Sequence, residues 1–184
     1  MLTKTTISGL KALVFLGLHP DHQPVSPRVI AQAFGESPTY LAKVLRQLVK
    51  AGILKAQRGV AGGVSLNRSP EQISLLSIVE ACQGVLLGDF CQETEDLTLT
   101  CAFHQAAAEL HRVIVDVLSR WTLADMLKRP SPDPSLPERE KCWLYPGFEI
   151  VELVPPEKKE RPVTPSRPRP GRTMKAGKTR GQEV

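Results

Sequence analysis

The fold is decided by residues 26–50, SPRVIAQAFGESPTYLAKVLRQLVK, which contain two helix starts built on the same device. Ser26-Pro27 and Ser37-Pro38 each place a hydroxyl that can accept an unsatisfied first-turn N–H. A proline follows, and its missing N–H costs nothing at the first helical position. Gly35 lies between the two starts and easily takes the left-handed conformation that ends a helix. We therefore predict helices over 27–34 and 38–50 joined by a tight turn, which is typical of a helix-turn-helix.

The second predicted helix has one apolar and one polar face. Apolar residues recur at helical spacing on the face that we expect to be buried: Leu41, Val44, Leu45, Leu48 and Val49. The opposite face offers side chains that can reach phosphates and base edges in a major groove of DNA: Thr39, Tyr40, Lys43, Arg46, Gln47 and Lys50. The pattern predicts a recognition helix.

Beyond Gly52 the apolar pattern changes from helical to extended. Residues 53–57 and 64–67 are predicted as two short strands, with the glycine-rich sequence RGVAGG of residues 58–63 between them. A β-hairpin packed beside a helix-turn-helix is called a wing. Its glycines allow a sharp bend close to a phosphate backbone, and Arg58 at its base suits a minor groove.

Helices are also predicted on either side of this unit, over 3–18, 74–81, 102–120 and 122–127. The helix over 102–120 carries a long apolar stripe that ends at Trp121, which we expect to lie in the core. A stripe of this length on so small a chain favours dimerisation over internal packing alone. The predicted fold class is mainly α: a winged helix-turn-helix with a β-hairpin wing and a long C-terminal dimerisation helix.

Charge is segregated along the 184 residues, although the whole chain carries only +5. Residues 1–68 hold 9 Lys and Arg against 2 Asp and Glu (+7), residues 69–154 hold 6 against 14 (−8), and residues 155–184 hold 9 against 3 (+6). A basic block at the front of an acidic body indicates a polyanion partner. We predict a DNA-binding domain over 1–68 and a sensing loop with dimerisation helices over 69–129. Residues 130–184 are expected to form a proline-rich basic extension that is largely disordered.

The same sequence disfavours several classes of protein. No stretch reaches the roughly 18 to 20 consecutive apolar residues of a membrane span, and the N-terminus shows neither a basic leader nor a cleavage site, so we expect a cytoplasmic protein with no membrane partner. No nucleophile with an adjacent base is evident and no phosphate-binding glycine motif opens a helix, so we expect no enzyme. The rival to a DNA-binding regulator is a winged-helix protein-interaction module without DNA binding, which the basic first block disfavours.

Two strings, residues 37–54 and the hairpin RGVAGGVSL of residues 58–66, resemble the Rrf2 family of bacterial winged-helix regulators. The resemblance runs from about residue 2 to Leu127 and includes the ending TLADML of residues 122–127. It is specific because it combines helix, turn, hairpin and glycine positions. One departure is Val64, where the family usually has a tyrosine.

The resemblance implies a homodimer that is built on the long helix and binds a double-stranded, pseudo-palindromic DNA operator. Such a protein regulates transcription, and we expect a repressor. Each subunit would place its recognition helix in a major groove and a wing arginine in the flanking minor groove. Carried over residue by residue, the DNA-facing positions are Ser37, Thr39, Tyr40, Lys43 and Arg46 of the helix and Arg58, Gly62 and Gly63 of the wing.

Sensing members of this family bind an iron-sulfur cluster through three cysteines in the loop before the dimer helix, in some cases with a histidine or an acidic group as the remaining ligand. The corresponding loop here retains Cys91, Cys101 and His104, whereas the middle cysteine is absent and the loop is shorter. Three protein ligands fall short of the usual four unless a carboxylate or the partner subunit supplies the last. The open alternatives are a 2Fe–2S or 4Fe–4S cluster that senses iron-sulfur status or nitric oxide, another metal such as zinc, a thiol redox switch, or no cofactor.

Overall fold

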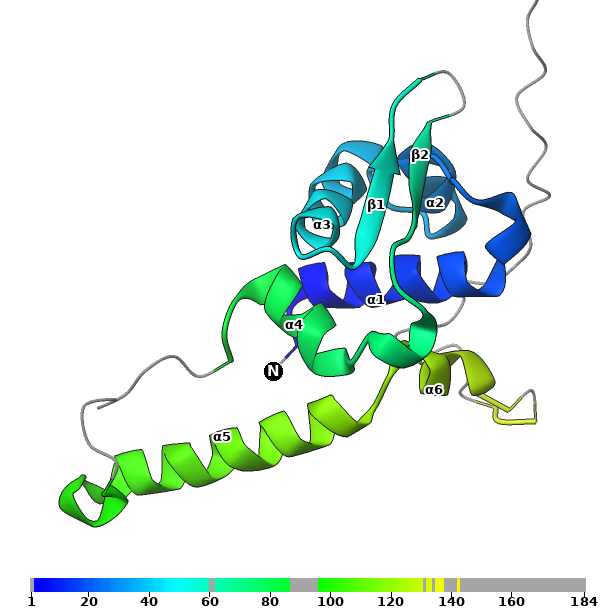
Figure 1. Cartoon of the computed structure of the whole chain (residues 1–184). Coiled ribbons are helices and arrows are strands. Elements are labelled where there is room, and N and C mark those ends of the chain that lie inside the picture. The colour runs from blue at the N-terminus through cyan, green and yellow to red at the C-terminus, as the bar shows by residue number, and fades with distance from the viewer. Residues whose placement is uncertain are drawn as a thin grey trace, which may run out of the picture. The chain divides into compact units, whose positions relative to one another are not determined.

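The computed structural model describes residues 2–59, 62–86, 96–130, 132, 133, 135–137 and 142. Its helices are α1 (Lys4–Leu18), η1 (Pro20–His22), α2 (Pro27–Ala33), α3 (Pro38–Lys50), η2 (Pro70–Gln72), α4 (Leu75–Gln83), η3 (Leu97–Leu99), α5 (Ala102–Arg120) and α6 (Leu123–Lys128); its strands are β1 (Leu54–Gln57) and β2 (Gly63–Leu66) (Figure 1). The predicted mainly α fold with a hairpin wing and a long C-terminal helix is confirmed. Within the described ranges, no helix combines the length and apolarity of a membrane crossing.

The two helix starts differ in how they are capped. The Ser26 hydroxyl accepts a hydrogen bond from the backbone N–H of Val29 at 3.3 Å, as predicted. The Ser37 side chain makes no such bond, so the expected hydroxyl cap of α3 is wrong. Helix α3 begins instead on the proline at its first position, and the Ser37 carbonyl accepts from the backbone N–H of Leu41 at 2.9 Å. Between the helices Gly35 adopts φ 62°, the left-handed conformation expected at a helix end.

Helix α1 forms the centre of the core. Residues 12–16 are all buried, and the apolar faces of α3, α4 and the hairpin pack in the same cluster. Two glycines let other helices approach α1 closely. A Cβ added at Gly9 would lie 2.8 Å from Sγ of Cys82 in α4, and one at Gly17 would lie 2.7 Å from a methyl carbon of Leu127 in α6. Larger residues at either site would push these helices apart.

Two polar side chains of α1 are buried and hydrogen-bonded, as buried polar groups must be. The Ser8 hydroxyl donates to Oε1 of Glu36 at 2.7 Å, and the Thr6 hydroxyl donates to Oε1 of Gln83 at 2.9 Å. Glu36 belongs to the turn between α2 and α3, and Gln83 is the last residue of α4. Helix α1 therefore holds the helix-turn-helix turn and the end of α4 by side-chain hydrogen bonds as well as by packing.

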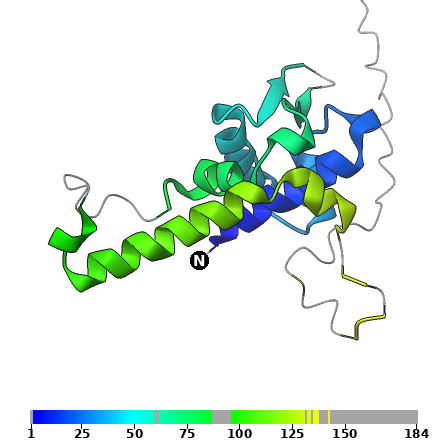
Figure 2. The same cartoon turned by 60° about the horizontal axis from the view of Figure 1, so that its bottom comes forward.

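Helix α5 contacts α4 but has no buried residue of its own. Both views show its N-terminal half extending beyond α4 (Figures 1 and 2). At its other end Trp121 is 49% exposed, so the expectation that it lies in the core is wrong. The backbone here is extended: the N–H of Leu75 donates to the carbonyl of Trp121 at 2.8 Å, which fixes the main chain and leaves the indole outside. The capping box of Thr122 and Asp125 then starts α6, close to the helix start that the sequence predicts at residue 122.

Candidate nucleic-acid interface

The outward face of α3 is formed by exposed polar and basic side chains. Its exposed members are Thr39, Lys43, Arg46, Gln47 and Lys50, and Ser37 just before the helix is exposed as well. The opposite face is anchored in the core by Leu41, Val44, Leu45 and Leu48, which are all buried. An amphipathic helix held so firmly by its apolar face presents the other face as a rigid surface.

Tyr40 differs from the other residues of α3 that the sequence assigns to DNA contact. It is only partly exposed, and its hydroxyl donates to Oγ1 of Thr5 in α1 at 3.4 Å. The Nζ of Lys4 lies 5.7 Å from the centre of the Tyr40 ring, within the range of a cation–π contact. Tyr40 therefore packs the first turn of α3 against α1, a positioning task that the sequence did not reveal.

Neither α3 nor the hairpin contains an acidic residue. Three cations lie on α3 (Lys43, Arg46 and Lys50), and two lie on the hairpin (Lys55 and Arg58). The nearest acidic residue in sequence is Glu36, whose carboxylate accepts from the buried Ser8 hydroxyl. The two elements therefore combine into a surface of one charge sign, which attracts polyanions over a distance set by salt screening.

The hairpin is held beside α3 by a third extended segment that precedes α2. Val25 and Val64 exchange two backbone hydrogen bonds, each 2.9 Å long. Gly63 lies so close to this segment that an added Cβ would overlap the Val25 carbonyl and lie 2.9 Å from the Ser26 nitrogen. A Cβ at Gly62 would lie 2.5 Å from the carbonyl oxygen of Gln57. Both wing glycines are thus required by close backbone approach inside the protein.

Gln23 makes a second connection that sequence reasoning missed. Its amide nitrogen donates to the Leu16 carbonyl at 2.8 Å, and its amide oxygen accepts from the backbone N–H of Leu66 at 2.8 Å. The side chain thus joins the end of α1 to the end of β2. No local pattern marks such a residue, because its partners lie 7 and 43 positions away.

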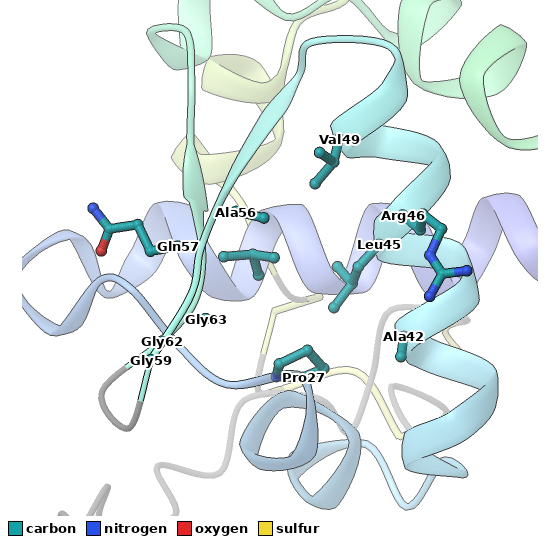
Figure 3. A pocket seen from close by; sticks show the side chains of 11 residues that line it. Pro27, Ala42, Leu45, Arg46, Val49, Ala56, Gln57, Gly59, Gly62 and Gly63 are labelled. Carbon is teal, nitrogen blue, oxygen red and sulfur yellow. The ribbon is translucent and has the colours of Figure 1, made fainter. Parts of the chain in front are cut away.

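A hollow of about 380 Å³ lies between α3 and the hairpin (Figure 3). Small and aliphatic residues form most of its lining, among them Ala42 and Val49 from α3, Ala56 and Val64 from the hairpin and Pro27 from the start of α2. Arg46 lies on the α3 wall, and Gln57 and three glycines belong to the hairpin wall. An apolar hollow is therefore set into a cationic surface.

Of the predicted metal ligands, Cys101 and His104 are neighbours at the start of α5, whereas Cys91 lies outside the described residues. Cys101 is exposed, and its Sγ lies 2.8 Å from Nδ1 of His104. A thiolate and an imidazole are suitable donors for zinc or for an iron-sulfur cluster. No further His, Cys, Asp or Glu in the described part of the chain joins them in a group that can hold a metal ion. The described residues supply two ligands, which is fewer than either group requires.

Cys82 has a different environment. It is 5% exposed, beside Gly9 of α1, and burial raises the pKa of its thiol to about 11. A thiol with so high a pKa stays protonated at neutral pH, and thiols in that form are poor ligands and poor nucleophiles. Cys82 acts as a small apolar residue of the core.

Comparison with known families gives a match over residues 2–129 to the Rrf2 family, described as iron-dependent transcriptional regulators. That span contains every described helix and strand.

Solved structures with the same fold include CymR from two bacteria and IscR from a third. CymR of B. subtilis, described as the global cysteine regulator, is 25% identical, with a TM-score of 0.58 over 70% of this chain and 96% of that one. IscR of T. potens is 32% identical, with a TM-score of 0.57 over 71% of this chain and 88% of that one. CymR of Staphylococcus aureus, at 23% identity and a TM-score of 0.53, adds support for the fold.

Proposed function

Because the chain belongs to the Rrf2 family of transcriptional regulators, we propose that it binds its DNA operator with α3 in a major groove and the hairpin at the adjacent minor groove. Residues 1–68 contact the DNA in this proposal, and residues 69–129 hold the dimer together. The observation that supports it best is the surface of α3 and the hairpin, which carries five cations and no acidic side chain. A protein-interaction module has no need for such a surface.

We assign the side chains of this surface to two kinds of DNA contact, contacts with phosphates and contacts inside the grooves. Lys43 and Lys50 are exposed point charges on α3 and suit phosphate oxygens. Arg46 and Thr39 are exposed on the same helix and can reach base edges, where a guanidinium binds guanine through two hydrogen bonds. Arg58 directly follows β1 and is exposed, so we assign it to the minor groove. Ser37 lacks a capping bond and can donate to a phosphate, while Tyr40 positions α3.

Salt dependence tests the proposal directly. Neutralising phosphates releases counterions, so the logarithm of the binding constant should fall linearly with the logarithm of salt concentration, with a slope of about −0.9 for each phosphate contacted. The measurement is a fluorescence-anisotropy titration of mixed-sequence genomic duplexes at four salt concentrations. Absence of binding, or binding that ignores salt, would reject a DNA-binding regulator and favour the interaction module.

Two arginine variants give the first specific prediction. Arg46→Ala and Arg58→Ala should each weaken binding to a selected duplex by about tenfold or more, because each removes a contact made by a charged, hydrogen-bonding group. Arg112→Ala is the matched control, since Arg112 is exposed on the polar side of α5, away from its apolar seam. Unchanged isotherms for both interface variants, or an equal loss in the control, would contradict the assignment.

We also propose that α5 forms a homodimer with a second copy of the chain. Its exposed apolar side chains follow a three-four spacing, in the order Phe103, Ala106, Leu110, Val113 and Val117. Phe103 is 67% exposed, Leu110 53% and Val113 54%. The half-buried residues Ala107, Ile114 and Leu118 lie on a different face of the helix. A seam of this spacing is what two helices need in order to pack together, and a continuous apolar strip is otherwise rare on a soluble surface.

The sensing role rests on the Cys101–His104 pair. We propose that both residues act as ligands if this regulator binds iron or zinc, so the metal content of anaerobically purified protein should fall in Cys101→Ser and in His104→Ala. Cys82→Ala is the control because Cys82 is buried and protonated. Metal measured by plasma emission spectrometry decides the question: wild-type protein without iron or zinc, or variants that keep their metal, would exclude this pair as ligands.

A further inference from the structure

We infer that Gln83, the last residue of α4, positions helix α3 for operator binding, although it lies outside the DNA-binding residues 1–68. It acts through the first turn of α1, which is hydrogen-bonded both to Gln83 and to Tyr40 of α3. Gln83 is thus a positioning residue, because its effect on the DNA surface passes through another helix. The inference rests on the proposed function, since only DNA binding can reveal a displaced α3.

The amide oxygen of Gln83 accepts two hydrogen bonds from the start of α1. The backbone N–H of Thr3 donates at 3.1 Å, and the hydroxyl of Thr6 donates at 2.9 Å. Thr6 is 0% exposed, so its hydroxyl depends on partners inside the protein. Because that hydroxyl gives its only proton to Gln83, Thr3 must be the donor in the 3.0 Å contact between the two threonine hydroxyls. One oxygen of Gln83 therefore orders the polar contacts at the start of α1.

The same turn of α1 supports the start of α3. Thr5 accepts from the Tyr40 hydroxyl at 3.4 Å, and the Nζ of Lys4 lies 5.7 Å from the centre of the Tyr40 ring. The first N–H groups of a helix have no partner within it, and helix ends fray unless such groups are bound. Loss of the Gln83 acceptor should free the turn that holds Tyr40. The first turn of α3, which carries Thr39, then loses its support.

Gln83→Leu tests the inference because it removes the acceptor and keeps a side chain of similar size. The variant should bind a duplex that the wild-type chain selects from a random-sequence pool about fivefold more weakly, the usual effect of losing one net hydrogen bond. The salt slope should not change, because every phosphate contact remains. Gln72→Leu is the matched control, since Gln72 is exposed in η2. A stoichiometric titration separates weaker binding from partial unfolding, which would lower the active fraction of the protein instead.

A double-mutant cycle with Tyr40→Phe tests the route from Gln83 to α3. Tyr40→Phe removes the hydroxyl that reaches Thr5 and should also weaken binding by about fivefold. If Gln83 acts through Tyr40, the double variant should lose about fivefold in total. Two residues that act independently would instead give the product of the two losses, about 25-fold.

A spectroscopic signature in the free protein completes the test. The chain has only two tyrosines, so carbon-13 labelling of tyrosine gives a simple spectrum in which Tyr40→Phe identifies the Tyr40 signal. Gln83→Leu should shift that signal in the absence of DNA, and Gln72→Leu should leave it in place. The inference is overturned if Gln83→Leu binds like the wild type, if the control loses as much affinity, if the double variant shows the full product, or if the Tyr40 signal does not move. Wild-type protein that binds no duplex would instead reject the proposed function itself.

Discussion

Replacement of Leu110 by glutamate is expected to turn the proposed dimer into monomers and to weaken binding to a two-half-site operator by at least about 100-fold. Leu110 is 53% exposed in the single chain and lies in the middle of the apolar seam of α5. In the dimer the new carboxylate would be buried against the seam of the other copy with no partner, at a cost of several kcal/mol. Loss of the dimer then removes the gain of two linked half-sites, which amounts to roughly 10² to 10⁴ in affinity.

Two measurements check this result, the mass in solution by light scattering and the affinity for a duplex with two half-sites. Ser119→Glu is the matched control because it introduces the same side chain on the polar face of α5, where Ser119 is exposed. The control should remain dimeric and bind normally. A Leu110→Glu protein that is still a dimer, or wild-type protein that is already a monomer, would show that the seam has another role.

Much of the fold could be predicted because its signals are local. Ser26-Pro27, Gly35 and Ser37-Pro38 set the ends of α2 and α3 within a few residues, since proline and left-handed glycine act on the backbone where they stand. The apolar period of α5 likewise defined a helix that the structure places at Ala102–Arg120. One local signal did not hold: the Ser37 hydroxyl makes no capping bond.

The interface was harder to predict where tertiary contacts decide the role of a residue. Tyr40 lies on the outward face of α3 by periodicity, yet its hydroxyl reaches Thr5 of α1. Trp121 completes the apolar stripe but lies outside the core, because its backbone pairs with Leu75. Gln23 has no sequence signature at all. These contacts join segments that are far apart in the chain, and no pattern of neighbouring residues encodes them.

The glycines of the wing are another case in which a tertiary contact decides why a residue is present. The sequence explains Gly63 by the need for a sharp bend near a phosphate, whereas the structure places it in β2, opposite Gln57, with an extended segment packed against it. It is a glycine because there is no room for a Cβ. The distinction matters, since a position that needs only conformational freedom and one that needs space respond differently to alanine.

Replacement of Gly63 by alanine is therefore expected to lower the free energy of unfolding by on the order of 3 kcal/mol. The new Cβ would overlap the carbonyl of Val25, and backbone cannot rotate away as a side chain can. Relief requires the hairpin to separate from this segment, which breaks the two 2.9 Å hydrogen bonds between Val25 and Val64. Chemical denaturation should show the loss, and amide hydrogen exchange should show early loss of protection at Val64.

The Gly35→Ala variant measures the cost of lost conformational freedom without any steric overlap. Gly35 has φ 62° and nothing within 4 Å of an added Cβ, so the variant bears only the strain of a left-handed alanine, about 1 kcal/mol. The two variants should thus differ by about 2 kcal/mol, although only Gly35 has a backbone conformation that favours glycine. Equal losses in the two proteins would mean that the hairpin is not held by its contact with Val25. The position of the hairpin beside α3 would then have to depend on its packing against α3, the β1–β2 pairing and the Gln23 side chain.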